Sequence, residues 1–128
     1  MKKKLFLWFF LVLIGVLGGI WLSLFSGAEG KHFLFPHIDT HFSKDFKIEK
    51  WEKIRIGMSM DTVKQFLGEP LSSSMAKQSP FRPPCATFEM HYSGDGASKF
   101  ADFAWQSFDI FFDEHNKVVS KSSEWFYD

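Results

Sequence analysis

The chain has 128 residues, and its 15 basic side chains balance its 15 acidic ones. Three of the basic residues, Lys2–Lys4, lie at the N-terminus, so the rest of the chain is mildly acidic. This makes nucleic acid a poor partner, since nucleic acid binds basic surfaces. Roughly 100 residues follow the first apolar segment, which is enough for one small domain.

The N-terminal lysines precede an uncharged segment, and its apolar part is Leu5–Phe25. A helix of that length rises roughly 30 Å, the thickness of a bilayer's hydrocarbon core. The sequence therefore predicts a transmembrane helix that contacts the lipid bilayer through residues 5–25. The positive-inside rule places Lys2–Lys4 in the cytoplasm and exports the rest. We expect a single-pass protein of the inner (cytoplasmic) membrane with a periplasmic C-terminal domain.

A cleaved signal peptide is the alternative for this segment. Small residues, Ser26-Gly27-Ala28, stand where a signal peptidase would cut. The apolar region of a signal peptide is usually about 7–15 residues, shorter than this one. Its length favours an uncleaved signal-anchor over residues 1–26, while cleavage after Ala28 would release the domain.

Residues 27–47 contain glycines, Pro36 and mixed polar side chains, and they are predicted to be a juxtamembrane linker. His32, His37 and His41 lie there, but their spacing matches no known metal-site pattern. We expect these histidines to be solvated, and the sequence predicts neither a metal nor another cofactor.

From residue 48 the pattern predicts a domain that extends to residue 128. Residues 46–54 fit a short helix or a strand equally well. The next stretch predicts a helix that begins after the N-cap Ser59, carries Val63, Phe66 and Leu67 on one face and ends at Gly68.

Residues 71–84 are predicted to be a loop, and three strands follow it. Residues 86–92 alternate between apolar and polar side chains, residues 105–112 form the second strand, and residues 117–126 return after a turn. The expected fold is a two-layer α+β domain in which one or two short helices pack on a three-stranded antiparallel sheet.

No catalytic motif is present, so we expect no enzymatic activity. The alternative is an enzyme that uses Cys85 with His91, or the carboxylates Asp109 and Asp113. Cys85 is the only cysteine and is expected to be a buried, inert thiol. Carboxylates beside turns are usually solvated.

One motif resembles the opening of the SmpA/OmlA family, whose members include the BamE-type subunit of the outer-membrane β-barrel assembly machine. The matching positions are Ile54, Gly57, Met58, Ser59, Val63, Leu67, Gly68 and Pro70. The resemblance covers residues 48–126 and implies a β-lactamase-inhibitor-protein-like fold that binds other proteins. Family members in that machine are lipoproteins, anchored through a cysteine that this chain lacks. The resemblance therefore implies a paralogue that acts from the inner membrane.

Together these features predict a membrane-anchored envelope protein whose BamE-like domain binds a protein partner, in envelope or outer-membrane assembly. The candidate partner contacts are Phe81, Arg82, Trp105, Trp125 and Phe126. The alternative is a secreted or periplasmic inhibitor-like protein that inserts Phe81 and the proline-rich loop into a target.

Overall fold

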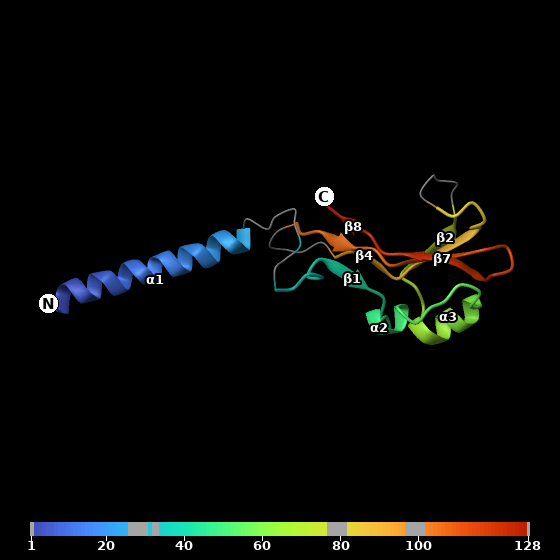
Figure 1. The fold of residues 1–128 in the computed structure, drawn as a ribbon, viewed down its shortest axis with the longest axis horizontal. Helices are drawn as coiled ribbons and strands as arrows, with labels where there is room; N and C mark the ends of the chain where they lie inside the picture. Colours follow the sequence, from blue (N-terminus) through green and yellow to red (C-terminus); the bar gives the residue numbers. More distant parts are fainter. Residues whose placement is uncertain (1, 26–30, 32–33, 77–81, 97–101, 128) are drawn as a thin grey trace.

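The computed structural model describes residues 2–25, 31, 34–76, 82–96 and 102–127 (Figure 1). The first element is the helix α1 (Lys2–Phe25), which extends away from the other helices and the strands in Figure 1. Side chains of α1 are exposed, including Trp8 at 71% and Trp21 at 66%. The element therefore adds nothing to the core of the domain.

The prediction of a transmembrane helix over residues 5–25 is wrong. Among the described residues, no helix combines the length and the apolar character that a membrane crossing requires. The predicted signal-anchor and the inner-membrane location are corrected on this finding.

After α1, the described chain is mostly β, with eight strands in three antiparallel sheets. The largest sheet has the strand order β2 (Ser72–Met75), β3 (Phe88–His91), β6 (Asp109–Phe112) and β7 (Val118–Ser122). Two smaller sheets pair β1 (Thr40–Phe42) with β4 (Ser93–Asp95), and β5 (Trp105–Gln106) with β8 (Trp125–Phe126).

The predicted α+β domain with one three-stranded sheet is therefore wrong. The strand β2 lies in the predicted loop, and β4 replaces a predicted turn. β1 lies in the stretch that was predicted as a linker. These strands have only three or four residues each, and β2 and β4 contain serine, glycine or aspartate, which strands usually disfavour or use sparingly. Each one pairs with a partner distant in sequence, so no local pattern reveals it.

Two short helices lie together on one side of the strands in Figure 1, α2 (Ile48–Trp51) and α3 (Met60–Leu67). The prediction for α3 is confirmed in its ends and in the burial of Val63 and Leu67. The Ser59 hydroxyl accepts a hydrogen bond from the amide of Thr62 at 3.2 Å, which satisfies a free donor of the first turn. Gly68 ends the helix with a φ of 79°.

The core lies between these helices and one face of the four-stranded sheet. Its fully or nearly buried members are Phe46, Ile54, Val63, Leu67, Met90, Tyr92, Phe108, Ile110, Phe112 and Val118. The alternation of β3 and β6 predicted the inward positions of Met90, Ile110 and Phe112. Phe66 was predicted on the buried face of α3, but it is 41% exposed.

Candidate functional site

Three of the predicted partner contacts come together on the ribbon formed by β5 and β8. Trp105 is paired with Phe126 across the two strands, and their rings stack with centroids 4.7 Å apart. Trp105 is half-buried, whereas Phe126 is 43% exposed. We call β5 and β8, with Trp105, Trp125 and Phe126, the aromatic ribbon.

The opposite face of the aromatic ribbon is also aromatic. Trp125 stacks on the imidazole of His37 with centroids 5.4 Å apart, and the ammonium of Lys31 lies 4.2 Å from the Trp125 ring centroid. Burial lowers the pKa of His37, and the charge of Lys31 lowers it further. The imidazole is therefore neutral at pH 7 and packs as an aromatic ring.

An open apolar groove adjoins this face. Residues 34–38 line it, and His37 belongs both to the groove and to the stack on Trp125. Leu34 and Phe35 expose 67% and 61% of their surface. The groove thus adjoins the Trp125 face of the aromatic ribbon through His37, and exposed apolar side chains of this kind are typical of interaction sites.

Hydrogen bonds from buried side chains hold the aromatic ribbon in place. Thr40 on β1 accepts a hydrogen bond from the Gln106 amide at 3.0 Å, and Ser93 on β4 donates to the Gln106 carbonyl at 2.8 Å. The Ser107 amide also donates to the Glu124 carbonyl at 2.8 Å, next to β8. The exposed rings therefore project from a fixed backbone.

The other two predicted contacts do not join the aromatic ribbon. Phe81 lies outside the described residues. Arg82 forms an ion pair with the buried carboxylate of Glu89, and its guanidinium lies 5.8 Å from the Phe111 ring centroid. Arg82 is thus a partner of a buried acid within the fold.

Sequence reasoning missed a polar network on the face of the four-stranded sheet that points away from the core. Glu89 is 3% exposed and accepts a hydrogen bond from Ser74 at 2.8 Å. His91 lies between two carboxylates, with Nδ1 2.7 Å from Asp109 and Nε2 3.4 Å from Glu89. The alternation of residues 87, 89 and 91 placed them on one face, but their partners come from other strands.

Three residues of the enzyme alternative, His91, Asp109 and Asp113, interact with other groups of the fold. The hydrogen bond to Asp109 raises the pKa of His91, burial opposes the rise, and the charges of Asp109 and Glu89 add to it. Asp113 accepts hydrogen bonds from the amides of His115 and Lys117, both at 2.9 Å, and so stabilises the turn before β7. The expected burial of Cys85 is wrong, since the thiol is exposed.

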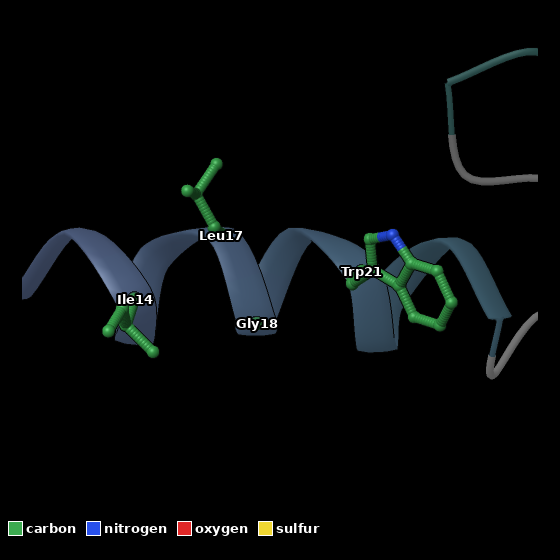
Figure 2. A pocket seen from close by; sticks show the side chains of 4 residues that line it. All are labelled: Ile14, Leu17, Gly18 and Trp21. Carbon is green, nitrogen blue, oxygen red and sulfur yellow. The ribbon is translucent and has the colours of Figure 1, made fainter.

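Two further features, the predicted histidines and a hollow on α1, form no enclosed site among the described residues. His32 lies outside the described residues, and among those described no group of three or more histidine, cysteine or acidic side chains could hold a metal. Figure 2 shows a hollow along α1 that is lined by Ile14, Leu17, Gly18 and Trp21. All four belong to one helix, so the hollow is open and does not enclose a ligand.

Comparison with known proteins gives no family assignment. No protein-family model matches the chain, and no curated protein sequence matches it.

Proposed function

We propose that this chain is a non-enzymatic protein-binding module that docks a partner protein on the aromatic ribbon. The observation that carries the proposal is the stacked pair of the half-buried Trp105 and the exposed Phe126, on a backbone that hydrogen bonds from Thr40 and Ser93 fix. Tryptophan and other aromatic side chains are enriched at protein interfaces, and tryptophan often contributes most of the binding energy. Rings that are already ordered lose little conformational entropy when a partner covers them.

The groove beside Trp125 supports a protein rather than a small molecule as the partner. The groove is open, and its apolar side chains at residues 34–38 adjoin the Trp125 face of the aromatic ribbon through His37. A small ligand is usually enclosed in a concave pocket, whereas proteins bind broad surfaces. The Lys31 ammonium above Trp125 favours an acidic residue at the edge of the partner's apolar surface.

The absence of a catalytic motif in the sequence supports a role without chemistry. His91 and Asp113, two groups of the enzyme alternative, already bind groups of this chain.

Site-specific photocrosslinking in the native cell tests the proposal. A photoreactive aromatic amino acid at position 126 should crosslink one partner, and Trp105→Ala should abolish the crosslink because it removes the ring that stacks on the side chain at position 126. The matched control places the same amino acid at Glu114, which is 77% exposed on the turn before β7. Equal crosslinking at the two positions would contradict the proposal.

A further inference from the structure

We propose a second interaction surface: the edge strand β2 accepts an extended segment of a partner protein as a fifth strand of the four-stranded sheet. The inference is independent of the aromatic ribbon, which belongs to a different sheet. Figure 1 also shows β2 and β8 apart along the long axis of the molecule.

The two edges of the four-stranded sheet differ. The chain itself covers the start of β7, since the Gly57 amide donates to the Val118 carbonyl at 2.8 Å and the Val118 amide donates to the Met58 carbonyl at 2.9 Å. The ammonium of Lys121 on β7 donates to the Trp51 carbonyl at 2.9 Å. This edge is thus closed by backbone pairing and by a lysine.

The opposite edge is open in the described part of the chain. β2 pairs with β3 on one side and ends the strand order on the other, and all four of its residues are exposed. The Ala76 amide donates to the Thr87 carbonyl at 2.9 Å in the same ladder. Because antiparallel ladders alternate, Ser72 and Ser74 direct their backbone groups toward β3, and Ser73 and Met75 direct theirs outward.

The residues of β2 itself carry none of the charges or prolines that often protect an edge, although the strand has only four residues and Pro70 and Lys77 flank the stretch 71–76. Proteins block exposed edges with lysine, proline, bulges or inward-pointing charges, because unpaired amides and carbonyls attract other strands. Residues 71–76, Leu-Ser-Ser-Ser-Met-Ala, contain neither a charge nor a proline. The serine side chains are small enough to let another backbone approach.

The side chains beside β2 define the chemistry of the added strand. On one face, Leu71 is 40% exposed and Met75 is 71% exposed, which favours apolar side chains. On the other face, Ser72 and Ser74 are exposed, which favours polar ones. A proline-free segment that alternates apolar and polar residues fits both faces. A second copy of β2 fits less well, because serines dominate it.

A synthetic peptide tests this inference directly. The probe is an end-blocked peptide with three Val-Thr repeats and a terminal lysine for solubility, and the control peptide carries proline at the central valine. The probe should shift the NMR signals of residues 71–76 and 88–91, while the proline peptide should not. Absence of such shifts at millimolar probe would overturn the inference.

Two variants make the test specific to the outward backbone of β2. Ser73→Pro removes one outward amide and should weaken probe binding at least tenfold, whereas Ser73→Ala keeps the amide and should bind as the wild type does. If Ser73→Pro does not fold, Met75→Lys adds a protecting charge at an exposed position and should weaken binding similarly. If Ser73→Pro and Met75→Lys bind the probe as tightly as the wild type does, the inference is overturned. Concentration-dependent shifts in β2 without peptide would show that a second copy is the occupant.

Discussion

The buried carboxylate of Glu89 is paired with Arg82, and the imidazole of His91 lies 3.4 Å from it. The Glu89 side chain is 4% exposed, and Arg82 is its cationic partner. Removing one member of a buried ion pair leaves an uncompensated charge, so Arg82→Met should lower the free energy of unfolding by about 3 kcal/mol. Urea denaturation measures the loss. Glu89→Gln in the same chain should recover most of it, and a neutral effect of Arg82→Met alone would contradict this account.

The imidazole of His91 should make stability depend on pH. Its pKa is raised, first by the hydrogen bond to Asp109, so the folded state favours the protonated form. The stabilisation is complete below the ordinary histidine pKa of about 6.5 and is lost as the pH rises through the raised value. His91→Gln should therefore destabilise the chain more at about pH 6 than at about pH 8.5.

Urea denaturation at both pH values measures this difference. His115→Gln is the matched control, because the His115 side chain is 77% exposed and lies 3.6 Å from an equally exposed Glu114. A loss of stability in His91→Gln that is equal at both pH values would show that the imidazole acts only through packing.

The sequence predicts local side-chain roles better than long-range ones. The capping role of Ser59 follows from the residues within one turn of it. The partners of His91 and Glu89 lie on other strands, as in the pair of His91 and Asp109. Such a network depends on strand register, which the sequence alone did not define.

Among the secondary-structure elements, the N-terminus of α3 depends on one side chain. The Ser59 hydroxyl accepts from the Thr62 amide and lies 2.8 Å from the Thr62 hydroxyl. Ser59→Ala should lower the free energy of unfolding by about 1 kcal/mol, the usual contribution of an N-cap. Thermal denaturation followed by circular dichroism measures it. Ser72→Ala on exposed β2 is the control and should change little; equal effects would contradict the capping role.

The C-terminus of α3 requires glycine for two reasons. Gly68 has a φ of 79°, and a β-carbon there would lie 2.7 Å from the Asp45 β-carbon. Gly68→Ala should therefore lower the free energy of unfolding by about 2–3 kcal/mol, through backbone strain and a steric clash. Gly57 has a φ of 87° but open space around it, so Gly57→Ala should cost only about 1 kcal/mol. Equal losses in urea denaturation would rule out the clash.

The difference between α3 and the short strands explains which elements could be predicted. A cap, an apolar face and a glycine stop identify α3 within a few residues. β1 and β4 have three residues each and pair across a long separation, Thr40 with Asp95. Strands this short lack enough alternation to be distinguished from turns. The split of the predicted strand over 105–112 into β5 and β6 has the same cause.

At the scale of the whole molecule, amino-acid composition led to two predictions, a transmembrane helix and a set of aromatic partner contacts. The apolar residues of α1 led to a transmembrane prediction, and the described residues contain no helix that meets the requirements. The aromatic side chains near the C-terminus led to predicted partner contacts, and the structure places three of them on one two-stranded ribbon. Composition indicates which residues are unusual, but only strand pairing shows which of them lie together.

The measurement that tests the central claim most directly is the affinity of the crosslinked partner for purified variants. Titration calorimetry should show that Phe126→Ala and Trp105→Ala each weaken binding about 30-fold or more, as expected for the loss of a binding hot spot. Ile56→Ala, at a side chain that is 78% exposed outside the ribbon, should bind with the wild-type affinity. Wild-type affinity in both aromatic variants, with their folds intact, would contradict the aromatic ribbon as the partner site.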